Sequence, residues 1–129
     1  MVQNYIARLP EFLNENEKLV RRGRYLETTF LLKSGSQCYY IRLHKGKIET
    51  MVNGQRLLKP WSFSITASDE AWLRHWMVSP PPGWHDIFAM AKIGEASIEG
   101  DLYPMMSNLR YFKELMALPR GMGAQSDAG

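Results

Sequence analysis

Two periods of hydrophobic residues divide the first half of the chain. Over residues 10–23 the apolar side chains recur at helical spacing, and the arginines of the last turn are followed by Gly23. We therefore expect a helix over residues 10–23, preceded by a shorter helical piece at residues 4–9. From about residue 24 to residue 52 the apolar positions alternate with a period of two, which predicts three strands joined by tight turns. Such a run is typical of an antiparallel meander.

The most regular alternation lies at residues 61–67 and predicts a fourth strand. One face is expected to be buried and the other polar. The apolar face comprises Trp61, Phe63, Ile65 and Ala67, and the polar face comprises Ser62, Ser64 and Thr66. Ser68 and two acidic residues then predict the start of a helix, which cannot continue through the prolines at residues 80–82. Its expected apolar face comprises Trp72, Leu73, Trp76 and Met77.

The remaining pattern adds a short helix at about residues 84–93, a fifth strand around Ala96 and Ile98, and a closing helix. The apolar face of the closing helix comprises Leu109, Phe112, Leu115 and Met116. The order of elements predicts an α+β fold in which helices pack on a five-stranded, mostly antiparallel sheet. We expect one domain over residues 1–120 and a flexible tail over residues 121–129, which is small and polar.

The net charge of +3 conceals an asymmetry between the two halves. Residues 1–60 carry eleven Lys or Arg and five Asp or Glu, whereas residues 61–129 carry five and eight. The basic half suits transient contact with a membrane surface, nucleic acid, or the anionic head of a ligand, for which Arg42, Lys45 and Lys47 are candidates. A solvated surface without a partner explains the same pattern.

The single cysteine, Cys38, cannot form a disulfide within the chain, which favours a reducing compartment. The chain shows no secretory signal pattern, no membrane-spanning apolar run and no peroxisomal Ser-Lys-Leu ending. We therefore expect a cytoplasmic protein.

Few residues suit catalysis or metal binding. His85 and Asp86 are adjacent, but neighbouring helical residues do not face each other. The three histidines are scattered, and neither a serine-hydrolase elbow nor a phosphate loop is present. We expect no catalytic residue, no metal and no cofactor, and a capping or loop hydrogen bond for His85.

A nucleic-acid partner is also not expected. Tyr39 and Tyr40 lie beside basic residues on a predicted hairpin, but they point to opposite faces, so only one ring could stack on a base. Methionine is more informative, because five of the eight methionines lie between residues 77 and 116, among several aromatic residues. Methionine lines cavities of variable content, although on composition alone these residues are better explained as core filling.

Three segments resemble the sterol carrier protein 2 (SCP2) family. Residues 63–72 resemble that family's strand followed by a Ser-acidic helix start and an aromatic residue. Residues 87–91 and 96–101 are similar to its buried short helix and to its strand ending in Gly and a polar residue, and residues 109–118 resemble its closing helix. The likeness covers about residues 10–118. The proline-rich stretch at 80–86 differs from typical sterol carriers.

The resemblance implies a carrier that binds a sterol, fatty acid, acyl-CoA or related lipid without chemistry, in a hydrophobic tunnel between sheet and helices. It suits a bacterial stand-alone member of the family. The predicted tunnel lining comprises Phe63, Ile65, Trp72, Trp76, Phe88, Met90, Met105, Met106, Leu109, Phe112 and Met116.

Two other hypotheses remain. The apolar surface, with Trp84 and the proline segment, could dock a partner enzyme or a second copy of the chain, so that the protein is a monomer or a homodimer. The third hypothesis is a small enzyme that uses His85 and Asp86.

Overall fold

Five strands form one sheet in the spatial order β3-β2-β1-β4-β5. The computed structural model describes residues 2–54 and 60–120. The strands are β1 (Glu27–Ser34), β2 (Gln37–His44), β3 (Lys47–Asn53), β4 (Phe63–Ala67) and β5 (Ala96–Gly100). The helices are α1 (Val2–Ala7), α2 (Leu9–Glu15), α3 (Glu17–Arg22), α4 (Asp69–His75), α5 (Ile87–Lys92), α6 (Tyr103–Met106) and α7 (Leu109–Met116). The predicted α+β class is therefore confirmed.

The central strand is β1, which pairs antiparallel with β2 and parallel with β4. The outer pairs β2–β3 and β4–β5 are antiparallel. Gly35 and Gly46 have φ values of 58° and 81°, so both tight turns use the left-handed conformation that glycine adopts without strain. The expected meander of the first three strands is confirmed. The parallel pairing was not predicted, because no local sequence signal specifies a contact between distant strands.

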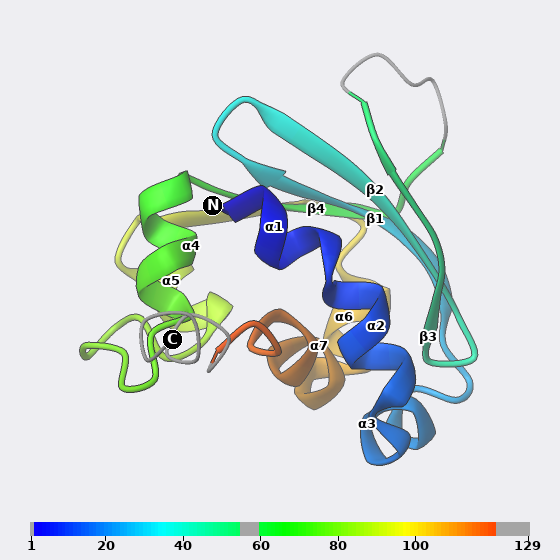
Figure 1. The fold of residues 1–129 in the computed structure, drawn as a ribbon. Coiled ribbons are helices and arrows are strands. Elements are labelled where there is room, and N and C mark those ends of the chain that lie inside the picture. The colour runs from blue at the N-terminus through cyan, green and yellow to red at the C-terminus, as the bar shows by residue number, and fades with distance from the viewer. Residues whose placement is uncertain (1, 55–59, 121–129) are drawn as a thin grey trace.

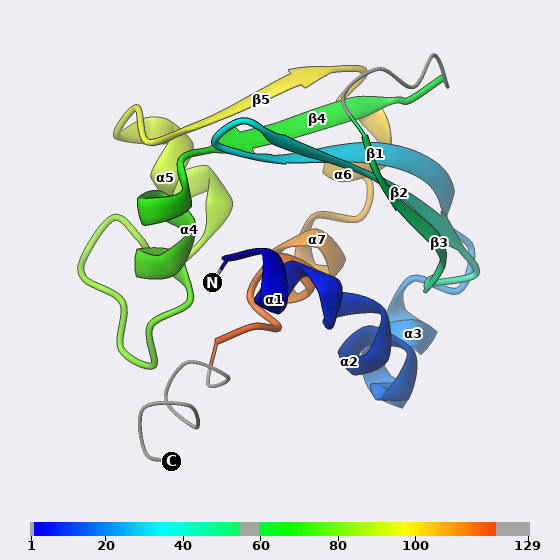
Figure 2. The same ribbon diagram turned by 45° about the horizontal axis from the view of Figure 1, so that its top comes forward.

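The helices gather on one face of the sheet (Figures 1 and 2). Alternate strand residues such as Phe30, Ile41 and Ile65 point toward the helices and are 0% exposed. The opposite face has its own small buried cluster of Leu31, Cys38 and Tyr40. The sheet is thus covered by helices on one side only, and the main core lies between that side and the helices.

Asn16 interrupts the helix expected over residues 10–23. Its ψ of 88° ends α2, and its side-chain oxygen accepts a hydrogen bond of 3.1 Å from the backbone N–H of Leu19, which starts α3. Asparagine favours such caps because its side chain competes with the helix for backbone donors. The prediction of one continuous helix was wrong at this residue, and the preceding helix spans Val2–Ala7 instead of residues 4–9.

Two residues assigned to the apolar core are exposed. Trp61 precedes β4 and is 41% exposed, and Met77 follows the end of α4 and is 48% exposed. Both predictions extended a periodic pattern past the end of the regular element, where side-chain direction no longer follows the period. Ser64, expected on a polar face, is buried on the face away from the helices.

The two later helices also differ from the expected bounds. Asp86 has an extended backbone, and one of its carboxylate oxygens accepts hydrogen bonds of 2.8 Å from the N–H groups of both Phe88 and Ala89. The helix expected from residue 84 therefore begins at Ile87, because Asp86 is its cap. The closing helix is confirmed as α7, with the short helix α6 before it.

Three aromatic side chains join the core elements through their polar atoms. The indole N–H of Trp72 donates to the carbonyl of Lys33 at 3.0 Å, and that of Trp76 donates to the carbonyl of Met116 at 2.7 Å. The hydroxyl of Tyr111 donates to the carbonyl of Gly46 at 2.8 Å. Each ring is buried while its donor is satisfied, so these bonds fix α4 and α7 relative to the sheet and turns.

Residues 117–120 are held against α4 by Arg120. Its guanidinium donates to the carbonyls of His75 and His85 at 2.8 and 2.9 Å. His75 is 0% exposed, and its Nδ1 lies 2.9 Å from the carbonyl oxygen of Trp84 and 3.3 Å from a guanidinium nitrogen of Arg120. Burial lowers the pKa of His75; the Trp84 carbonyl and Asp86 oppose this, whereas the charge of Arg120 adds to it. The ring is therefore held neutral in the fold.

Gly46 offers a test of the turn that connects β2 and β3. A Cβ at this position would lie 2.3 Å from the carbonyl oxygen of Val20, in addition to the strain of a positive φ. Gly94 has almost the same φ, 82°, but no atom within 4 Å of its Cβ position. We expect Gly94→Ala to lower the free energy of unfolding by about 1 kcal/mol and Gly46→Ala to lower it clearly further. Urea denaturation measures both, and equal losses would contradict the close approach.

The neutral state of His75 predicts a pH dependence of stability. Because the folded pKa lies below the unfolded value of 6.5, the unfolded chain binds the proton first as the pH falls. The stability contributed by neutral His75 is complete above pH 6.5 and is lost as the pH falls below it. We expect urea midpoints to decline from pH 7.5 to pH 5.5 more steeply in the wild type than in His75→Asn. Parallel slopes would show that another group is responsible.

Candidate functional site

The predicted tunnel residues come from five elements on the helix side of the sheet. Eight of them belong to the main core cluster, namely Phe63, Ile65, Trp72, Trp76, Met90, Met105, Phe112 and Met116. Phe88 is partly buried and packs against this cluster. Leu109 is half-buried outside it, and Met106 is 57% exposed. The structure thus brings together nine of the eleven residues, and their role as a ligand lining stays a prediction.

This apolar layer is closed. Phe30 and Phe63 stack with ring centroids 5.3 Å apart, Phe112 meets both rings edge-on, and Trp72 stacks on Trp76 at 5.4 Å. If the layer enclosed a cavity large enough for one water molecule, the side chains around that cavity would have some solvent-accessible surface. Among the predicted lining residues, Phe63, Ile65, Trp72, Met90, Met105 and Phe112 are 0% exposed. A ligand in this layer must therefore move side chains or helices apart.

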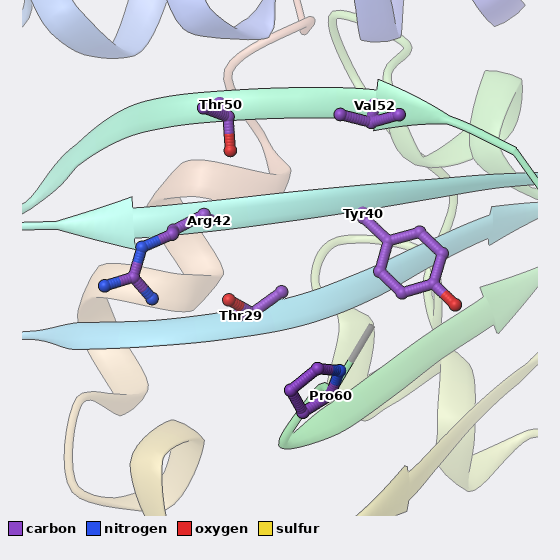
Figure 3. Close-up of a pocket in the computed structure, with 6 residues that line it drawn as sticks. All are labelled: Thr29, Tyr40, Arg42, Thr50, Val52 and Pro60. Carbon is purple, nitrogen blue, oxygen red and sulfur yellow. The ribbon is translucent and has the colours of Figure 1, made fainter. Parts of the chain in front are cut away.

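Two neighbouring hollows lie on the other face of the sheet. Figure 3 shows one of them, a space of about 180 Å³ lined by Thr29, Tyr40, Arg42, Thr50, Val52 and Pro60. The second hollow, of about 530 Å³, is lined by Leu31, Lys33, Gly35, Ser36, Gln37, Cys38, Tyr40 and Trp61. Alternation along β2 places Cys38, Tyr40 and Arg42 on this face. It missed the hollows, because they depend on how residues 60–61 approach β1 and β2.

The guanidinium on this face is already engaged by carboxylates. Arg42 donates to the carboxylate of Glu27 at 2.6 Å and lies 3.9 Å from that of Glu49. Arg42 lines the hollow of Figure 3, on the face opposite the apolar layer, which does not fit the expectation that it meets the head of a ligand bound in that layer. Burial raises the pKa of the Cys38 thiol, and the charge of Lys33 offsets this only in part. The thiol is thus held protonated, which suits a structural side chain.

His85 and Asp86 are in contact, contrary to the helical geometry expected for them. The ring Nε2 lies 3.4 Å from a carboxylate oxygen of Asp86, because the backbone at Asp86 is extended and not helical. The other oxygen of Asp86 caps α5, and Lys113 lies 3.8 Å from the carboxylate. The carboxylate is thus occupied by structural contacts, and the expected loop contact of His85 is with Asp86.

Within residues 2–54 and 60–120, no three His, Cys, Asp or Glu side chains are grouped to hold a metal ion. The same residues contain no helix long and apolar enough to cross a membrane.

No family model matches the chain, and no curated protein matches it by sequence. Solved structures do match. Sterol carrier protein 2 superposes with a TM-score of 0.70 at 14% identity, over 91% of this chain and 94% of that one. Protein TT1886 of Thermus thermophilus, described as possibly a sterol carrier protein, gives 0.67 at 14% identity, over 92% and 85%. The UbiJ-SCP2 ubiquinone synthesis protein gives 0.56 at 14% identity, over 88% and 85%.

These matches cover 88–92% of the chain, at an identity of 14% that is too low to carry a function. The sequence-based resemblance is therefore confirmed at the level of architecture: the chain has the SCP2-like fold.

Proposed function

We propose that this protein binds an apolar small molecule without catalysis, in the layer between the sheet and helices α4 to α7. A sterol, fatty acid, acyl-CoA or related lipid is the expected ligand class. The observation that carries the proposal is the composition of this layer, in which nine predicted lining residues pack together within a fold shared with sterol carrier protein 2. The expected setting is the cytoplasm of a bacterium.

The closed layer requires a mechanism of opening. Met90, Met105 and Met116 are at most 1% exposed and lie among the aromatic rings. Methionine has three rotatable side-chain bonds and repacks more easily than aromatic or β-branched residues. We infer that these three side chains give way to the ligand. Burying apolar ligand surface contributes about 25 cal/mol per Å², which offsets the cost of separating protein surfaces that were already packed.

The alternative of an interaction module has less support. It relied on Trp84 and the proline segment as the contact, but Trp84 is 8% exposed and the guanidinium of Arg74 lies 5.1 Å from its ring centre. The enzyme hypothesis is also weaker, because Asp86 is committed to capping α5.

Native mass spectrometry of freshly purified protein, followed by organic extraction, tests whether a lipid co-purifies. The proposal expects a stoichiometric apolar mass that the extract identifies. An empty protein that also takes up no fluorescent fatty acid would contradict the proposal.

Substitutions locate the ligand within the core. Met90→Ala and Met116→Ala shorten side chains of the proposed layer, and Leu13→Ala shortens a buried side chain of α2, in the half of the core that packs on β3. Each should lower the free energy of unfolding by about 2–5 kcal/mol. Only the two methionine variants should bind a fluorescent fatty acid more weakly, by roughly tenfold. Removing the contacts of about two methylene groups lowers the binding free energy by about 1.4 kcal/mol.

Leu13→Ala is the control for general loosening of the core. If all three variants changed the affinity equally, the ligand would not lie in the proposed layer. An unchanged affinity in both methionine variants would have the same meaning.

A further inference from the structure

The exposed large apolar side chains are not spread evenly over the molecule. Five of the eight found among the described residues lie at one end of the sheet, where β1 and β4 begin and β2 and β5 end. These five are Tyr25, Trp61, Leu102, Tyr103 and Met106, with exposed fractions between 37% and 88%. We call this the β5–α6 end. The other three, Met77, Val78 and Ile93, follow α4 and α5 at the opposite end (Figure 2).

Contacts between the loops hold part of this group together. The N–H of Asp101 donates to the carbonyl of Ser62 at 2.7 Å, and the indole of Trp61 approaches Gly100 closely enough to meet an added Cβ at 3.1 Å. Leu102 immediately precedes α6, and Tyr103 and Met106 lie within it. Spacings of three and four residues place these side chains on one side of that turn. Trp61 and α6 therefore lie on neighbouring segments, and the ring of Trp61 also lines the hollow on the uncovered face of the sheet.

A group of cations lies at the same end of the sheet, on the side of β1 to β3, where Arg24 lies over the ring of Tyr25. The turn at Gly46 packs against the end of α3, since an added Cβ would meet the carbonyls of Val20 and Gly23. This contact brings together residues 18–27 and 42–49, which carry seven Lys or Arg and two Glu. Lys18, Arg21, Arg22 and Arg24 alone line a hollow of about 400 Å³.

Carboxylates at this end are few or already paired. Glu27 and Glu49 contact Arg42, and Glu114 lies 3.5 Å from Arg22. Glu17 lies beside Lys18 at the start of α3, and Glu99 and Asp101 lie on the β5 side. The opposite end of the sheet is balanced, with Lys33, Arg74 and Lys92 against Asp69, Glu70 and Glu95. The β5–α6 end thus combines exposed apolar residues with the basic hollow formed by Lys18, Arg21, Arg22 and Arg24.

We propose that the β5–α6 end docks on a bilayer that contains anionic phospholipid. Trp and Tyr are the residues that proteins place at the headgroup level, and Leu and Met reach the acyl chains. Lys and Arg beside them are attracted to the negative surface, each by about fivefold in affinity. The apolar residues project from loops and one short helix, a shape that penetrates a soft surface. This inference goes beyond ligand binding and does not depend on it.

The full chain tests the proposal by co-sedimentation with vesicles of phosphatidylcholine alone and of phosphatidylcholine with phosphatidylglycerol. Wild type is expected to bind the anionic vesicles preferentially. The double variant Trp61→Ser/Tyr103→Ser should weaken that binding by at least tenfold, and Lys18→Gln/Arg21→Gln by roughly 25-fold. The matched controls at the other end, Met77→Ser/Val78→Ser and Lys92→Gln, should change it less than twofold.

Equal losses in the variants and their matched controls would overturn the docking surface. So would wild type that binds neither vesicle, or both equally. If the apolar double variant kept full vesicle binding while the basic double variant lost it, the protein would be attracted to any polyanion, and the proposed membrane docking would be wrong. The affinity for a fluorescent fatty acid without vesicles should stay unchanged in all four variants, which separates this test from that of the ligand site.

Discussion

The contact among Phe30, Phe63 and Phe112 is the one on which the rest of the structure depends. Their ring centroids lie 5.2 to 5.7 Å apart, and the three residues belong to the two parallel central strands and to the last long helix. Phe30 and Phe63 are direct partners in the ladder, so the ring stack and the strand register support each other. A slip of one residue in β4 would turn Phe63 to the uncovered face and remove the ring against which Phe112 of α7 packs.

The two faces of the sheet carry different properties. The helix side holds tightly packed aromatic and methionine side chains, whereas the other side has hollows, in one of which Arg42 is engaged by neighbouring carboxylates. A core that is both the source of stability and the proposed ligand site must balance two demands. Close packing stabilises the empty protein, while any space made for a ligand weakens it. Flexible methionine side chains pack closely in the empty protein and still move aside for a ligand, which branched side chains do less readily.

Periodicity predicted the strands and the apolar face of α7 well, because burial on one side imposes a period on every residue of an element. It failed where a single side chain changed the backbone. Asn16 and Asp86 both capture backbone N–H groups and thereby end or start helices inside stretches that read as helical. It also could not predict the β1–β4 pairing or the exposure of Trp61, since both depend on how segments far apart in sequence meet. The lining of the layer was recognisable because large apolar residues recur on several elements, but its closed state depends on rotamers that no pattern specifies.

The parallel pairing of β1 with β4 has a consequence for the newly made chain. About thirty residues separate the two strands, so at roughly 5–20 residues per second β1 waits about 2–6 s for its second neighbour during synthesis. Until then one edge of a strand that carries Phe30, Leu31 and Leu32 offers unpaired hydrogen-bonding groups to other chains. In the folded protein that edge is in the middle of the sheet. At this edge of β1, the hazard of intermolecular strand pairing therefore belongs to the ribosome-bound chain, before β4 has been made.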